Sequence, residues 1–174
     1  MSEPSVGALE VPETCVLAVD LGLRCGLAWY VGGAGLSLRL VRHRCTEFHT
    51  RSRLKAAVGG ILREVPGLVA VVGEGDRSLW AFWEKAAASK GAESRLVTPE
   101  MWRAGLWGDR APVAGKDAKA LARKVAEGTG REDGLVVRFG QRGVTPMRTD
   151  AAEAVCIGYW AARERGWDTG GGDV

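Results

Sequence analysis

The run Leu68-Val69-Ala70-Val71-Val72 constrains the fold more than any other segment of this sequence. A strand with one face in water alternates apolar and polar residues, whereas this run contains no polar residue. It therefore predicts a strand that is buried on both faces, in a sheet with helices on both sides. A chain of 174 residues is long enough to form one such domain with a proper core.

The patterns on either side of this run predict an α/β domain with a mixed sheet. Three strands come first and read as an antiparallel meander, because glycine-rich turns separate them. Helical spacing of apolar residues then alternates with two further strands. The expected strands cover residues 15–20, 25–31, 36–48, 68–72 and 94–98, and the expected helices cover 49–65, 78–91, a short stretch from Pro99, 116–127 and 150–165. We expect residues 1–14 to be a flexible arm, 15–166 a single domain, and 167–174 a disordered, glycine-rich tail.

The positive charge of the chain is concentrated in two stretches. The net charge is only +3, from 24 basic and 21 acidic residues. Residues 38–64 carry seven basic and two acidic side chains, and residues 110–148 carry nine and four, so each stretch has a charge of +5. These stretches are either ordinary solvated faces or binding surfaces for phosphate groups, and most of their basic residues are arginines, which suit phosphate.

Several classes of protein are not expected. The sequence contains no run of about 18 apolar residues, so a membrane span is not expected. Residues 1–14 show no pattern of a secretory signal, which favours a cytoplasmic location. The chain has only two histidines and no C-x-x-C spacing, so a zinc site of the usual kind is not expected. We expect the four cysteines to be unpaired and buried. They are Cys15, Cys25, Cys45 and Cys156.

Four carboxylates stand where the predicted fold brings them together. Asp20 and Glu74 each end an apolar strand, and Asp150 and Glu153 lie three residues apart among alanines, on one face of the last helix. Alone, each has a simpler explanation, in a turn or at the positive end of a helix. Together they form an oxygen ligand set suited to Mg²⁺ or Mn²⁺, and two such ions about 4 Å apart catalyse displacement at phosphodiesters.

The order and spacing of these residues resemble the retroviral-integrase and RNase H superfamily, and within it the RuvC-type Holliday junction resolvases. The resemblance extends from about Val16 to Ala162. Its motifs are Val19-Asp20-Leu21-Gly22 with Gly26-Leu27-Ala28, the strand ending in Glu74, Val97-Thr-Pro99-x-x-Trp102, Gly115-Lys116-x-x-Lys119, and Asp150-Ala-Ala-Glu153-Ala. It implies an RNase H-like fold, in which a mixed five-stranded sheet begins with the antiparallel meander and continues with parallel strands.

The resemblance also implies an activity and a set of site residues. The expected activity is that of an endonuclease of DNA recombination and repair, a homodimer that cuts two opposed strands of a four-way junction with two Mg²⁺ ions, which Mn²⁺ can replace, and without a small-molecule cofactor. Asp20, Glu74, Asp150 and Glu153 would be the metal ligands, and Lys116 would assist catalysis. The residues expected to contact nucleic acid are Arg24, Arg77, Lys116, Lys119, Arg123, Arg142 and Arg148.

The sequence departs from that family at two positions. Glu153 stands where the family more often has aspartate, and Arg77 stands where an aromatic residue opens the junction, so Trp80 or Phe82 would have to replace it. The helix with Trp80 and Trp83 belongs either to the core or to a dimer interface. Trp102 and Trp107 could stack on bases, although burial suits Trp102 better.

Other functions remain open at this point. One is a different nuclease of the same fold, such as an RNA-processing enzyme similar to YqgF. Another is a DNA-binding module without catalytic activity, against which the four acids argue. The first hairpin also resembles that of actin-like ATP-binding proteins, but that fold needs two such domains and roughly twice this length.

Overall fold

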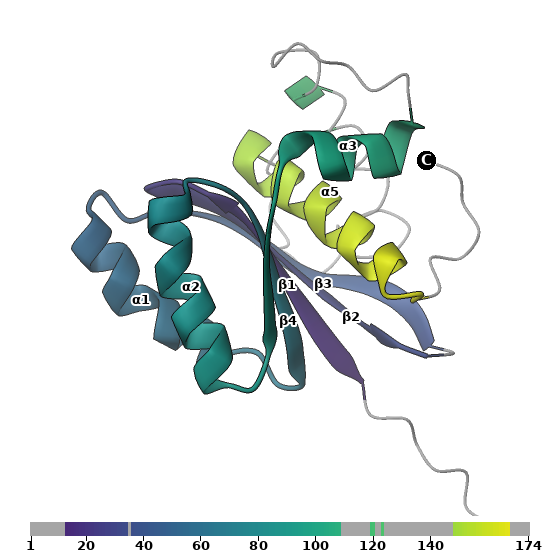
Figure 1. Cartoon of the computed structure of the whole chain (residues 1–174), viewed down its shortest axis with the longest axis horizontal. Helices are drawn as coiled ribbons and strands as arrows, with labels where there is room; N and C mark the ends of the chain where they lie inside the picture. The colour runs from purple at the N-terminus through teal and green to yellow at the C-terminus, as the bar shows by residue number, and fades with distance from the viewer. Residues whose placement is uncertain (1–12, 35, 109–118, 121–122, 124–147, 168–174) are drawn as a thin grey trace, which may run out of the picture.

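The computed structural model describes residues 13–34, 36–108, 119–120, 123 and 148–167. Five strands and four helices have defined bounds within these residues (Figure 1). They are β1 (Thr14–Leu21), β2 (Arg24–Gly33), β3 (Leu36–Glu47), α1 (Arg51–Arg63), β4 (Leu68–Gly75), α2 (Arg77–Ser89), β5 (Glu93–Val97), α3 (Pro99–Trp107) and α5 (Thr149–Glu164).

The strands form one mixed sheet in the order β3-β2-β1-β4-β5. The first three strands pair antiparallel. Strand β4 then pairs in parallel with β1, and β5 pairs in parallel with β4. Helices α1 and α2 cover one face of this sheet, and α3 and α5 lie over the other (Figure 1). The structure therefore confirms the predicted α/β class, the meander and the parallel strands that follow it.

The strand interior is buried on both faces, as the apolar run predicted. In β4, Val71 packs with the α1 and α2 side, whereas Ala70 and Val72 pack with α5. Strand β1 alternates in the same way, since Leu17 belongs to the first cluster and Ala18 to the second. Successive side chains of a strand point to opposite faces, so both strands contribute to two hydrophobic cores.

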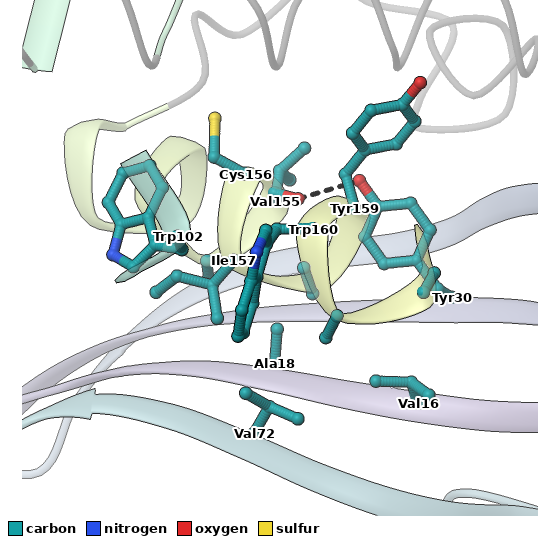
Figure 2. Close-up of a cluster of buried hydrophobic side chains, with 14 of the residues drawn as sticks. Val16, Ala18, Tyr30, Val72, Trp102, Val155, Cys156, Ile157, Tyr159 and Trp160 are labelled. Carbon is teal, nitrogen blue, oxygen red and sulfur yellow. Dashed lines mark hydrogen bonds between the residues drawn. The ribbon is translucent and has the colours of Figure 1, made fainter. Parts of the chain in front are cut away.

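Helix α5 lies close to the sheet because small residues line it. Every residue from Ala151 to Ala162 is buried. A Cβ atom at Gly158 would lie 2.6 Å from the Tyr30 ring, so a larger residue would push the helix away from β2. The Tyr30 hydroxyl donates a hydrogen bond of 2.9 Å to the Val155 carbonyl, the dashed line in Figure 2, and fixes the helix along the sheet.

Two local features differ from the expectations. Helix α2 begins at Arg77, one residue earlier than expected, and Asp76 is its N-cap, because the Asp76 carboxylate accepts a hydrogen bond of 2.7 Å from the Ser78 N–H. Trp167, which the sequence placed in the tail, is buried and lies against Gly32 of β2. Of the predicted helix 116–127, Lys119, Ala120 and Arg123 are helical and the rest lies outside the described residues.

In the described part of the chain, no helix has both the length and the apolar character needed to cross a membrane.

Candidate metal centre and nucleic-acid interface

Asp20 and Glu74 lie side by side at one edge of the sheet. They are register partners in the parallel pairing of β1 with β4, near the carboxyl end of each strand. Each lies two residues after a residue that packs on the α5 side, Ala18 in β1 and Val72 in β4. Because side chains alternate along a strand, both carboxylates are on the α5 face of the sheet. The two strand-end carboxylates therefore face the helix that carries the other two.

Gly26 brings the N-terminus of α5 onto this edge. It pairs with Asp20 across the β1–β2 ladder, and a Cβ atom built on it would lie 1.8 Å from the Asp150 carbonyl oxygen. Only glycine permits such a close approach of two backbones. The Cys25 thiol donates a hydrogen bond of 3.0 Å to the Gly22 carbonyl, which holds the turn between β1 and β2 beneath the site.

Three carboxylates meet at this point. Asp20, Asp150 and Glu153 each offer an oxygen, and these oxygens all lie within 4.8 Å of one another. Glu153 is the one buried charged residue among those that the structure describes. A ligand set made only of carboxylate oxygens fits a hard divalent cation, and such a cation would balance charges that otherwise repel each other.

The electrostatics of Asp20 show how unfavourable the cluster is without a cation. Burial, together with the charges of Glu153, Glu74 and Asp150, raises the pKa of Asp20 to about 8. The ordinary value for an aspartate is near 4. The metal-free site therefore holds a proton at neutral pH that a bound cation would displace.

A pH dependence of stability follows from this pKa. Because the folded protein binds the Asp20 proton more tightly than the unfolded chain does, the metal-free protein loses stability as the pH rises from about 4 to about 8. Divalent cations bind the ionised cluster, so we expect 10 mM Mg²⁺ to raise the melting temperature clearly at pH 8 and very little at pH 5. Thermal unfolding at both pH values, with Na⁺ at matched ionic strength as the control, tests this. An equal shift at both pH values would contradict it.

Glu74 stands slightly apart from the other three carboxylates. Its Oε2 atom accepts a hydrogen bond of 2.6 Å from the indole Nε1 of Trp102. Burial raises the pKa of Glu74, whereas this hydrogen bond acts in the opposite direction. The four predicted ligands thus share one edge of the sheet, with three in mutual reach and the fourth bound to α3.

Sequence reasoning missed two residues of α3 at this site. Trp102 was expected to be buried, which is confirmed, but its bond to Glu74 was not foreseen. Arg103 places Nη2 3.6 Å from a Glu153 oxygen, and its guanidinium lies 5.0 Å from the centre of the Trp102 ring. A buried indole N–H usually has a hydrogen-bond acceptor, and a buried acidic cluster is stabilised by a nearby cation. These two requirements are the only indications from which the roles of Trp102 and Arg103 could have been predicted.

Three of the predicted nucleic-acid contacts flank the acidic cluster. Arg24 begins β2 four residues after Asp20, Arg77 begins α2 three residues after Glu74, and Arg148 is the N-cap of α5. All three are exposed, although Arg24 also lies 3.5 Å from Glu47 in an ion pair. Lys119 and Arg123 are helical and exposed. Lys116 and Arg142 lie outside the described residues.

The aromatic residues of α2 require a correction. Trp80 and Trp83 are buried in the core between the sheet and α2, and the Trp80 ring lies against Gly73, so Trp80 does not have the exposure needed to enter DNA. Phe82 is partly buried, with the Arg51 guanidinium 5.7 Å from its ring centre. On α3, Trp107 is partly buried and packs edge-to-face against Trp102.

The four cysteines are free, and three of them are buried, as predicted. Cys45 is only partly buried, and its thiol lies 3.6 Å from the Asp150 carboxylate. Its neighbour across the β2–β3 ladder is Gly26, which explains how a residue of the edge strand β3 reaches the site. Burial and the Asp150 charge raise the pKa of this thiol.

Comparisons with known proteins give the fold a counterpart. No protein-family model matches the sequence, and no curated protein matches it. Among solved structures, RuvC of Thermus thermophilus is similar with a TM-score of 0.60 and 19% identity, over 89% of this chain and 99% of RuvC. T. thermophilus RuvC in complex with a Holliday junction substrate is similar with a TM-score of 0.56 and 17% identity, and the coverage of both chains is the same. Ydc2, the yeast mitochondrial Holliday junction resolvase, is similar with a TM-score of 0.55 and 12% identity, over 88% of this chain and 81% of Ydc2.

The similarity covers most of this chain and nearly the whole of RuvC. This chain has the RNase H-like fold of RuvC.

Proposed function

We propose that this protein is a metal-dependent endonuclease that resolves four-way DNA junctions by paired, symmetric nicks. One observation carries the proposal: on a RuvC-like fold, Asp20, Asp150 and Glu153 bring carboxylate oxygens within 4.8 Å of one another, at the edge where Glu74 also ends its strand. A solved structure of T. thermophilus RuvC holds a Holliday junction substrate, which supports branched DNA as the substrate class.

Asp20, Glu74, Asp150 and Glu153 are the proposed ligands of two Mg²⁺ ions, which Mn²⁺ can replace. Bound there, such ions supply an activated water and stabilise the leaving oxygen of a phosphodiester. The chain itself contributes the orientation of the ligands and the countercharge of Arg103, 3.6 Å from Glu153. Lys116, which is outside the described residues, is the proposed lysine that assists the reaction.

The exposed arginines around the cluster are the proposed DNA contacts. Arg24, Arg77 and Arg148 lie within a few residues of the carboxylates, where they would hold the phosphates on either side of the cut bond. Lys119, Arg123 and Arg142 would extend this surface. Because such contacts release counterions, affinity for DNA should fall steeply with salt concentration.

A homodimer is part of the proposal, because two opposed nicks require two sites related by a two-fold axis. Helix α2 is the proposed interface. Since Trp80 and Trp83 are committed to the core, the contact would be made by its outer face, which exposes Ala81, Glu84 and Lys85. Light scattering at micromolar concentration should give a mass of about twice 18.5 kDa; a monomer would count against paired cutting.

The decisive experiment compares three labelled substrates, a four-way DNA junction, the same sequences as duplex, and a structured RNA, each with and without Mg²⁺. We expect symmetric nicks in the junction only, and only with Mg²⁺. Cleavage of the RNA in preference to the junction would replace this proposal by an RNA-processing nuclease. Binding of the junction without cleavage at any Mg²⁺ or Mn²⁺ concentration would indicate a DNA-binding module instead.

A further inference from the structure

We propose that Trp102 is a positioning residue for the ion site, whose buried indole N–H holds the Glu74 carboxylate in the orientation from which Glu74 binds a divalent cation. The inference rests on the proposed function, because it requires that the acidic cluster binds an ion. It adds a residue of α3 to a site whose proposed ligands come from β1, β4 and α5.

The contact between the two side chains is short and buried. Trp102 Nε1 lies 2.6 Å from Glu74 Oε2, at the short end of hydrogen bonds between a nitrogen donor and a charged oxygen. Trp102 has an exposed fraction of 0%, so its indole N–H has no water with which to replace this acceptor. A bond between residues 28 positions apart therefore connects α3 directly to the end of β4.

The bond occupies one carboxylate oxygen and leaves the other available. A carboxylate offers about four acceptor sites on its two oxygens, so a bond at Oε2 leaves Oε1 free to face the cluster. Without the indole, Glu74 would gain rotamers, and the charge of nearby Glu153 would favour those that turn it away. Holding the carboxylate in place before an ion arrives removes that cost from binding.

The indole is itself held by its neighbours. The Trp107 ring packs edge-to-face against it with ring centres 5.5 Å apart, and the Arg103 guanidinium lies 5.0 Å from its ring centre. Its other contacts belong to the core under α5, in which Figure 2 draws it with Ile157 and Trp160. The bulk of Trp102 thus serves the core, and only its N–H reaches the site.

Trp83 provides a matched control for the loss of a buried indole. Its exposed fraction is also 0%, and its Nε1 has no hydrogen-bond partner among the residues that the structure describes. It lies on the opposite side of the sheet, in the α2 core. Trp83→Phe therefore removes packing alone, whereas Trp102→Phe removes similar packing and the hydrogen bond to Glu74.

The test measures Mn²⁺ binding by electron paramagnetic resonance, which needs neither DNA nor turnover. We expect Trp102→Phe to weaken Mn²⁺ binding about 10-fold, as loss of a partner that orients a ligand typically does, and Trp83→Phe to leave it within about twofold. In a Glu74→Ala background, Trp102→Phe should have no further effect. Equal Mn²⁺ affinity in the two tryptophan variants, or an undiminished effect of Trp102→Phe without Glu74, would overturn the inference.

A second readout uses the tryptophan as it is, in case Trp102→Phe does not fold. In a ¹⁵N–¹H correlation spectrum the indole N–H of Trp102 should be strongly shifted downfield by its charged acceptor, and Glu74→Ala should move that signal upfield while the Trp83 signal stays in place. An unmoved set of indole signals would contradict the hydrogen bond.

Cleavage measured on the same preparations separates this inference from the proposed function. Mn²⁺ binding that depends on Trp102, in a protein that does not cut four-way junctions, would uphold the inference and reject the proposed substrate. Junction cleavage by a protein whose Mn²⁺ affinity does not change on Trp102→Phe would uphold the proposed substrate and reject the inference. A wild-type protein that binds no Mn²⁺ would reject both.

Discussion

Asp20→Asn should abolish Mg²⁺-dependent cleavage of a four-way junction while leaving junction binding intact. Asn keeps the shape of the side chain but removes the charge from the residue at the centre of the cluster, where it meets Asp150 and Glu153. Loss of partners that merely orient metal ligands costs about 10–100-fold, so loss of a ligand charge should cost at least about 100-fold. DNA binding rests on the basic side chains and should not fall.

The same substitution should stabilise the metal-free protein. Burial and the neighbouring acids raise the pKa of Asp20 to about 8, so the metal-free protein loses stability between about pH 4 and pH 8, and the full cost is present above pH 8. Asn cannot ionise, and the melting temperature at pH 9 without metal should rise by about 2–4 °C if the gain is on the order of 1 kcal/mol. At pH 4, where Asp20 is protonated in the folded protein, the two proteins should melt together.

Asp76→Asn is the matched control for these measurements. Asp76 is exposed two residues beyond Glu74 and caps α2 through the Ser78 N–H, a role that asparagine fills equally well. It should leave cleavage unchanged, and it should not give the rise in melting temperature at pH 9 that we expect for Asp20→Asn. Normal junction cleavage by Asp20→Asn would show that the reaction does not use this cluster.

The carboxylate site was predictable because it depends on where the acids stand along the strands and the last helix. Asp20 and Glu74 each end a run of apolar residues, and ends of adjacent parallel strands share an edge of a sheet. The spacing of Asp150 and Glu153, and the alanines beside them, indicated a helix that lies close to that edge. These inferences need only the periods of helix and strand, which the chain carries locally.

The contribution of α3 could not be found in this way. Its orientation depends on contacts with α5, where a Cβ atom at Gly105 would lie 2.3 Å from Trp160 Nε1. Only that packing turns Trp102 toward Glu74 and Arg103 toward Glu153. Nothing in the local pattern of α3 specifies which residues of β4 and α5 its side chains meet, because they are distant in sequence.

The aromatic residues of α2 show the opposite problem. Trp80 and Trp83 have a helical spacing that suits a core or a dimer interface, and Trp80 was also a candidate for the residue that opens a junction. Gly73 decides the matter, since the Trp80 ring occupies the space where a Cβ atom of residue 73 would stand. The glycine was visible in the sequence, but the pairing of this glycine with that ring required the fold.

Gly26→Ala should damage the site as severely as the loss of a ligand, although residue 26 carries no functional group. The added Cβ would lie 1.8 Å from the Asp150 carbonyl oxygen and 2.2 Å from its carbon, both backbone atoms that cannot rotate away. The N-terminus of α5 must therefore move, and Asp150 and Glu153 move with it. We expect a loss of about 1–3 kcal/mol of stability in urea unfolding, as for other overpacked sites. Cleavage should fall at least about 100-fold, since a shift of 1 Å in a positioned group has that cost.

Gly59→Ala separates this effect from a general effect of replacing glycine. Gly59 lies inside α1, and its added Cβ would have no atom within 4 Å, so the only consequence is a better helix former. That variant should gain about 0.5–1 kcal/mol and keep normal Mn²⁺ affinity and cleavage. If Gly26→Ala instead bound Mn²⁺ and unfolded like the wild type, α5 would not approach β2 as closely as the structure has it. The grouping of Asp150 and Glu153 with Asp20 depends on that approach, so the same result would remove the basis of the ion site.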